Sequence, residues 1–111
     1  MIFSEIRPCK TKGALEVVPA TPDQLQLDAA AEVLEKTNFR VVNANILIVV
    51  SRPDIAETTI FEDGHMLVKT LDPREAHRSA AIVYREGTGI PESATFEEYL
   101  AAGRVTAKRA R

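Results

Sequence analysis

The stretch that decides the fold runs from Glu57 to Arg85 and reads ETTIFEDGHMLVKTLDPREAHRSAAIVYR. Two short runs that mix apolar and polar residues flank an Asp63-Gly64 pair. Because both central residues of a type I′ turn need positive φ, Asp-Gly is a preferred filling of a two-residue hairpin turn. We therefore predict a β-hairpin in which Glu62 faces His65 across the turn. This register places the apolar residues as follows: Phe61 faces Met66 and Ile60 faces Leu67, so one face carries Phe61, Met66 and Val68 and the other Ile60 and Leu67.

A helix-start signal follows the hairpin directly, at Asp72-Pro73-Arg74-Glu75. Asp72 can cap the helix, Pro73 suits the first helical position, and Glu75 can reach back to the amide of the cap. We predict a helix from Pro73 that ends at Gly87. Its apolar face is expected to consist of Ala76, Ala80, Val83 and Tyr84.

The N-terminal half predicts a strand followed by a helix. Residues 14–18 (ALEVV) predict a strand that Pro19 stops. Thr21 can cap a helix, with proline next and Gln24 at the third position to complete a capping box. The following LQLDAAAEVLEK carries a wide apolar stripe, which indicates a helix that lies across a sheet and ends near Asn38. Residues 1–12 form either a short edge strand or an arm that docks elsewhere.

An apolar run predicts a central strand. After Phe39 the pattern has the period of a strand, and Ile46 to Val50 is an unbroken run of β-branched residues and leucine. Such a run is typical of a strand covered on both faces, in the middle of a sheet. The preceding residues 43–45 (NAN) are either a tight turn between two strands or a bulge within one.

The C-terminal part predicts a short helix and a basic tail. Thr95 and Glu98 can form a capping box, and Phe96 and Tyr99 begin an amphipathic spacing. This helix is either a lid over the domain or a segment offered to a partner. Residues 104–111 (RVTAKRAR) hold four basic side chains and no acidic one, and we expect them to be flexible.

The order of elements predicts a two-layer α+β sandwich. We expect a mainly antiparallel sheet with two long helices on one face and a short C-terminal helix. Residues 1–90 would form a single α+β domain, residues 91–103 would hold the short amphipathic helix, and residues 104–111 would form the basic flexible tail.

The composition argues against several classes of function. A chain of 111 residues with 45% hydrophobic content is the size of one domain. No signal peptide or long apolar run is present, so we expect a cytoplasmic protein without membrane contact. The net charge of −2 argues against wholesale attraction to nucleic acid. A single cysteine, Cys9, excludes an internal disulfide and a CxxC zinc pair, and no glycine-rich phosphate loop occurs, so no cofactor is expected.

Three side chains are candidates for chemistry. His65 opposite Glu62 would be a base with an orienting carboxylate, although we expect an ordinary solvated cross-strand pair. His77 lies at the edge of an apolar stripe and is expected to be structural. Cys9 is the most reactive-looking group, but a lone cysteine is usually inert, and the spacings match no metal site. Three nearby cations would favour its thiolate: Arg7, Lys10 and Lys12.

A longer pattern resembles a known family. It combines NANILIV, then TTIFEDGHMLVK, then LDPREA at the start of a helix. This pattern is similar to the C-terminal region that follows the adenylation domain in some prokaryotic ThiF/MoeB/HesA-type, ubiquitin-activating-like enzymes. The matching positions are Cys9, residues 15–18, Asn45, Phe61, Asp63, Gly64, Lys69, Asp72, Pro73 and Ala76. The resemblance implies a detached accessory domain that binds an adenylating enzyme or its ubiquitin-like sulfur carrier and catalyses nothing alone.

We therefore predict a non-enzymatic protein-binding module whose exposed hairpin or edge strand contacts a protein partner by strand addition. A homo-oligomer is left open. The predicted binding residues surround the hairpin tip: Glu62, Asp63, Gly64, His65 and Lys69. Two alternatives remain: a small enzyme or sulfur-handling protein that uses Cys9, and a nucleic-acid-binding module. The latter would contact phosphates through Arg104, Lys108, Arg109 and Arg111.

Overall fold

The computed structural model describes residues 1–10, 13–21, 26–44 and 46–106. Its elements in chain order are β1 (Phe3–Pro8), β2 (Leu15–Pro19), α1 (Leu27–Lys36), β3 (Arg40–Asn43), β4 (Leu47–Arg52), β5 (Ile55–Phe61), β6 (Met66–Val68), α2 (Pro73–Thr88) and α3 (Phe96–Ala101). The strands form one sheet in the order β1-β2-β6-β5-β4-β3, and every neighbouring pair is antiparallel. The predicted α+β sandwich is thus confirmed.

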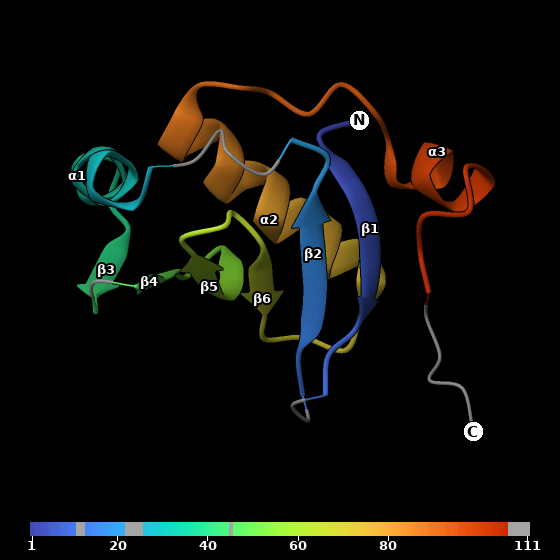
Figure 1. The fold of residues 1–111 in the computed structure, drawn as a ribbon, viewed down its shortest axis with the longest axis horizontal. Helices are drawn as coiled ribbons and strands as arrows, with labels where there is room; N and C mark the ends of the chain where they lie inside the picture. Colours follow the sequence, from blue (N-terminus) through green and yellow to red (C-terminus); the bar gives the residue numbers. More distant parts are fainter. Residues whose placement is uncertain (11–12, 22–25, 45, 107–111) are drawn as a thin grey trace.

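Both long helices pack on the same face of the sheet (Figure 1). α2 contacts β5, β2, β6 and β1, whereas α1 contacts β3 and β4 at one end of the sheet. The two helices meet at Gly87, where an added Cβ would lie 3.6 Å from Cβ of Ala30. Gly87 therefore lies inside α2 and allows this approach, and the prediction that it ends the helix is wrong. The helix ends instead at Thr88, and Gly89, with a φ of 79°, forms the left-handed cap.

The opposite face of the sheet carries no helix among the described residues, and we call it the open face. Along β4, Ile48 and Val50 are fully buried toward the helices, whereas Leu47 and Val49 are only half-buried. The prediction that this strand is covered on both faces is wrong for that reason. Antiparallel partners share a face, so pairing aligns one row across the open face: Val42, Val49, Thr59, Leu67, Glu16 and Arg7.

The β5–β6 hairpin forms, but its register differs from the predicted one. The Phe61 amide donates to the His65 carbonyl at 3.0 Å, and the Gly64 amide donates to the Phe61 carbonyl at 2.9 Å. The loop therefore has three residues, with Gly64 at φ 92° in the position that requires positive φ. Ile60 consequently pairs with Met66. This register buries Ile60, Met66 and Val68 on one face, whereas the predicted register would have placed Ile60 on the opposite face.

The predicted N-cap residues of α2 and α3 are confirmed. Asp72 caps α2 by accepting from the Arg74 amide at 3.0 Å, but its own amide donates to Oγ1 of Thr70, so the predicted Glu75 capping box is wrong. The box at α3 is confirmed, because Thr95 and Glu98 bond each other's backbone amides. At α1 the N-cap is Gln26, whose side chain forms no cap hydrogen bond, so the predicted cap at Thr21 is wrong; Gln24, its predicted box partner, lies outside the described residues.

Two short connections settle points that the sequence left open. The Ala44 amide donates to the Leu47 carbonyl at 2.9 Å, so a tight turn joins β3 and β4; Asn45 lies outside the described residues. Asn38 has a φ of 68°, as expected for the residue that ends the preceding helix.

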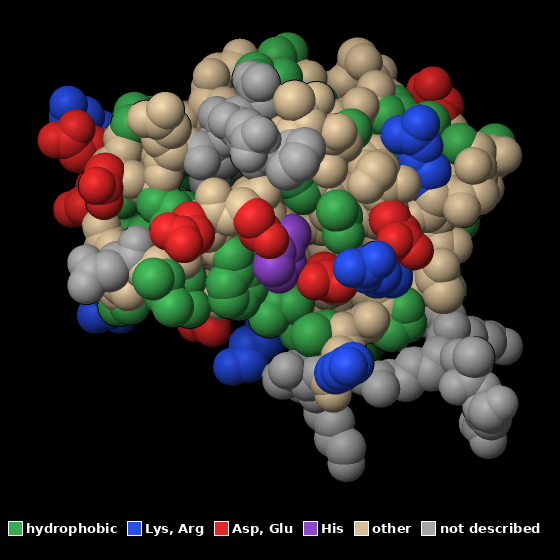
Figure 2. Space-filling model, in the orientation of Figure 1, with side chains coloured by type: hydrophobic (Ala, Val, Ile, Leu, Met, Phe, Trp, Pro, Cys, Tyr) green, Lys and Arg blue, Asp and Glu red, His purple; other side chains and the backbone are tan. Residues whose placement is uncertain are grey.

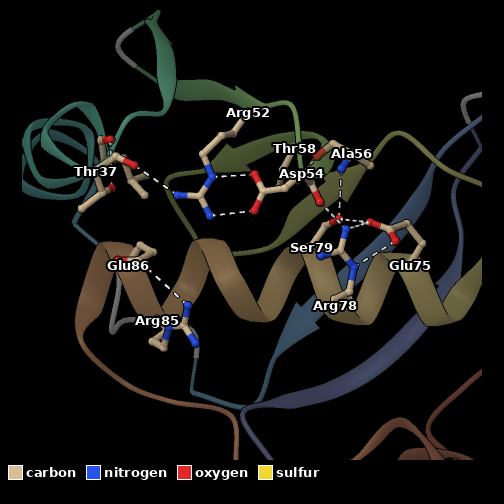
Figure 3. A network of polar contacts seen from close by, with 11 residues as sticks. Thr37, Arg52, Asp54, Ala56, Thr58, Glu75, Arg78, Ser79, Arg85 and Glu86 are labelled. Carbon is tan, nitrogen blue, oxygen red and sulfur yellow. Dashed lines mark hydrogen bonds and ion pairs between the residues drawn. The ribbon is translucent and has the colours of Figure 1, made fainter.

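A polar network fastens both helices to the β4–β5 turn (Figure 3). The Arg52 guanidinium bonds the Asp54 carboxylate at 2.6 and 3.0 Å and the Thr37 carbonyl at the end of α1. From α2, Arg78 donates to the Asp54 carbonyl, and Oγ of Ser79 accepts from the Ala56 amide at 3.1 Å. The residues of this network are thus committed to holding the two layers together.

Candidate functional site: the hairpin tip, the open face and the sheet edges

The histidine at the hairpin tip lies between two carboxylates. Nδ1 of His65 is 2.5 Å from Oδ1 of Asp63, and Nε2 is 3.3 Å from Oε2 of Glu16 on β2. Its ring stacks on Phe61 with centroids 4.6 Å apart. The predicted pairing of His65 with Glu62 is wrong, because the three-residue loop brings Phe61 opposite His65. Both ring nitrogens can donate to these carboxylates at once only when the imidazole is protonated.

The carboxylates around this histidine are themselves engaged. Partial burial of Asp63 acts to raise its pKa, but hydrogen bonds from the amide and ring of His65 prevail and lower it. Glu16 also accepts from Nε of Arg7 at 2.6 Å, and Arg7 reaches Glu5 at 2.8 Å. The result is a row of paired charges that runs from the hairpin loop across β2 to β1. Figure 2 shows a histidine among acidic side chains, beside hydrophobic ones.

The predicted binding residues are only partly brought together. Asp63 and His65 are in contact and Gly64 shapes the loop. Lys69 lies past the far end of β6, 3.8 Å from a carboxylate oxygen of Glu57, and Glu62 is exposed. The hairpin tip is therefore a surface ion-pair network, in which exposed pairs contribute little free energy each.

A partly exposed apolar area lies on and beside the open face. Val42 and Ile46 are 57% and 62% exposed. Val42 pairs with Val49 on β4, and the same face of the sheet continues with three further half-buried apolar side chains: Leu47, Phe61 and Leu67. Large exposed apolar side chains gathered next to a strand at the edge of a sheet are typical of a protein contact.

The two edges of the sheet differ in their backbone hydrogen bonding. In an antiparallel strand, residues alternate between those whose N–H and C=O point to the partner strand and those whose groups point away. On β1, the Cys9 amide donates to the Ala14 carbonyl, which sets the alternation so that Ile6 points outward. On β3, the Ala44 amide donates to the Leu47 carbonyl, so the same alternation makes Val41 point outward.

The outward groups of Ile6 are bonded, and those of Val41 are not. The Ile6 amide donates to the Arg104 carbonyl and the Thr106 amide donates to the Ile6 carbonyl, both at 2.8 Å. Residues 104–106 thus cover the β1 edge as a short parallel bridge. Within the described residues, no group bonds the N–H or C=O of Val41 on the β3 side. Of these two residues, Val41 on β3 therefore has an N–H and a C=O available to another strand.

The tail differs from its predicted flexible form where it is described. Arg104 donates from Nη1 to the Phe3 carbonyl at 2.9 Å, and its backbone pairs with β1. Arg104 thus serves this packing, rather than standing free as a predicted phosphate contact. Lys108, Arg109 and Arg111 lie outside the described residues.

Cys9 is half-buried just after β1. Its amide donates to the Ala14 carbonyl at 3.3 Å. Of its predicted cationic neighbours, Arg7 is bonded to two carboxylates, Lys10 is exposed, and Lys12 is outside the described residues. In the part of the chain that the structure describes, no three His, Cys, Asp or Glu side chains gather where they could hold a metal ion.

The sequence did not predict a buried polar cluster between α2, β1 and α3. His77 is 8% exposed, and its Nε2 has no hydrogen-bond partner among the described residues; Oε2 of Glu92 is 3.6 Å away. Glu92 accepts from the Tyr99 hydroxyl and from the Ala94 amide, and Tyr99 accepts from the Phe3 amide at 3.0 Å. Burial lowers the pKa of His77 and raises that of Tyr99. No sequence spacing links these residues, because three separate segments supply them.

A hollow of about 250 Å³ lies beside His77. It is lined by His77, Arg78, Ala81, Ile82, Arg85, Pro91, Glu92 and Ala94. Arg78 pairs with Glu75, and Arg85 contacts Glu86 at 3.3 Å, so both guanidinium charges are countered by carboxylates. Both guanidinium groups are therefore already engaged, which disfavours an anionic ligand in the hollow.

Comparisons with known proteins find no relative. No protein-family model matches the chain, and searches of curated proteins and of solved structures also find no match. Among the described residues, no helix has the length and apolar character needed to cross a membrane.

Proposed function

We propose that this chain is a non-enzymatic protein-binding module that takes up an extended segment of a protein partner at the β3 edge. The observation that carries the proposal is the difference between the two edges. Residues 104–106 bond the outward groups of Ile6, whereas those of Val41 have no partner among the described residues. Natural sheets commonly protect their edges, and strand addition to an unprotected edge is a widespread mode of peptide recognition.

The surroundings of β3 support the same function. Its sequence RVVN contains neither proline nor glycine and holds one charge, Arg40, so both valines of this short strand keep a backbone N–H that can pair. Val42, at 57% exposure, lies on the open face next to Val49. An added strand would gain backbone hydrogen bonds from β3 and apolar contact from Val42.

The partner class follows from the sequence resemblance. The matching stretch from Cys9 to Gly87 includes β3, β4, the hairpin and most of α2. The proposed partner is accordingly an adenylating enzyme of the ThiF/MoeB type or its ubiquitin-like sulfur carrier.

Site-specific cross-linking in the native host tests this function. A photoreactive residue is placed at Val42, on the β3 edge, and in a control protein at Ala29, an exposed position of α1. We expect an adenylating enzyme or a ubiquitin-like carrier to be cross-linked from position 42 and not from position 29. A second substitution, Val41→Pro, should abolish the product, because it removes an N–H that points away from β4.

Far-UV circular dichroism confirms that the Val41→Pro variant is folded. Recovery of neither partner class from position 42, or a product that survives Val41→Pro, would contradict the proposal.

A further inference from the structure

One flank of α1 is acidic and faces away from α2. An added Cβ at Gly87 on α2 would lie 3.6 Å from Ala30 and 3.7 Å from Leu34, so these two residues mark the α2 side of the helix. The helical period of 100° per residue then places Asp28 and Glu35 on the opposite flank, with Glu32 next to them. All three carboxylates are exposed.

The acidic flank lies above the β3 edge. α1 packs on β3 and β4, while α2 covers the strands nearer the other end of the sheet. Figure 1 shows α1 and β3 together at one end of the molecule. Among the described residues, no basic group forms an ion pair with Asp28, Glu32 or Glu35. The one basic residue of α1, Lys36, falls on its solvent side.

A strand added to β3 would have two unlike environments. It would lie about 4.8 Å beyond β3, with successive side chains pointing to opposite faces. Side chains on the helix side would sit below Asp28 and Glu35, within reach of a lysine or arginine. Side chains on the other side would meet Val42 on the open face, where apolar groups gain from burial.

On the basis of the proposed function, we infer that the segment bound at β3 alternates basic and apolar residues, with the basic side chains under the acidic flank of α1. Charge complementarity of this kind steers association and discriminates against other partners. A second copy of this chain fits less well, because its own α1 would bring a second set of carboxylates against Asp28 and Glu35. The occupant is therefore an extended segment of a different protein.

Synthetic peptides test the inference directly. Three peptides of about seven residues, a usual strand length, alternate valine with lysine, with serine or with glutamate. Their affinities for the full chain are measured by fluorescence anisotropy, with amide exchange of Val41 recorded by NMR. We expect the lysine peptide to bind about five-fold or more tightly than the serine peptide, as two modest ion pairs would produce, and the glutamate peptide weakest. Val41 should become protected on binding.

Two sets of variants separate the inference from the proposed function. The double charge reversal Asp28→Lys, Glu35→Lys should remove the preference for the lysine peptide. The matched control is the double reversal Glu57→Lys, Glu97→Lys, at two exposed positions away from α1, which changes the net charge equally and should retain the preference. Val41→Pro should remove binding of all three peptides.

Equal affinity for the lysine and serine peptides, with Val41 protected by both, would overturn the inference and leave strand addition standing. A lysine preference that persists in the double reversal would also overturn it. Binding that leaves Val41 unprotected, or no binding at all, would overturn both the inference and the proposed function.

Discussion

Removing the hydroxyl of Tyr99 should destabilise the fold far more than removing that of Tyr84. Both rings are buried and both pack against Phe3. The Tyr99 hydroxyl accepts from the Phe3 amide at 3.0 Å and donates to the carboxylate of Glu92, whose side chain is only 5% exposed. No such bond is formed by the Tyr84 hydroxyl among the described residues.

The magnitude follows from the two bonds that Tyr99→Phe would break. An unsatisfied buried amide costs about 1–3 kcal/mol, and a hydrogen bond to a charged group contributes about 1.5–3 kcal/mol. The free energy of unfolding should therefore fall by about 3–5 kcal/mol, a large part of the total for a domain of this size. Tyr84→Phe should change it by no more than about 0.5 kcal/mol.

Urea unfolding followed by circular dichroism measures both variants. With a typical slope for a small domain, Tyr99→Phe should lower the midpoint by about 2 M relative to Tyr84→Phe. The Phe3 amide should also exchange faster in the Tyr99 variant. Equal midpoints for the two variants would refute the argument that this buried cluster ties β1 to α3.

Three further outcomes follow from particular residues. Burial lowers the folded-state pKa of His77 below the ordinary value of 6.5, so its contribution to stability is complete above about pH 6.5. That contribution should be lost as the pH falls through the folded-state pKa, because the unfolded chain then binds the proton more readily. His77→Leu should flatten the pH dependence of the free energy of unfolding over this window. An unchanged pH dependence would contradict the lowered pKa of His77. Gly64→Ala places a side chain at φ 92° and should cost about 1 kcal/mol or more in urea unfolding, whereas Ala44→Gly serves as a turn control without that strain. Cys9→Ser should leave partner cross-linking from position 42 intact, and its loss would instead favour a function that uses the thiol.

Local signals predicted the helices and strands because short-range chemistry decides them. Asp72 and Thr95 cap helices where the sequence indicates caps, since a side-chain oxygen two or three residues from an amide needs no tertiary help. The hairpin was predicted for the same reason. Its register was not, because burial of Ile60 and the left-handed Gly64 together select a three-residue loop over a two-residue one.

Long-range contacts account for what the sequence could not predict. The bonds among Phe3, Glu92 and Tyr99 join segments that nothing in the local pattern connects. The apolar run of β4 indicated burial on both faces, but an unbroken run cannot tell a covered face from a partly exposed one. The pairing of residues 104–106 with Ile6 likewise overrides a basic composition that is typical of flexible tails.

The backbone alternation links the fold to the proposed function. A single rule, that every second residue of an edge strand turns its N–H and C=O outward, identifies Ile6 on β1 and Val41 on β3. At Ile6 the chain satisfies both groups with its own residues 104–106, which converts a potential binding edge into part of the fold. At Val41 the described chain provides no such strand. The acidic flank of α1 lies above the place that an added strand would occupy. A partner strand at β3 would thus complete at one end of the sheet what residues 104–106 complete at the other.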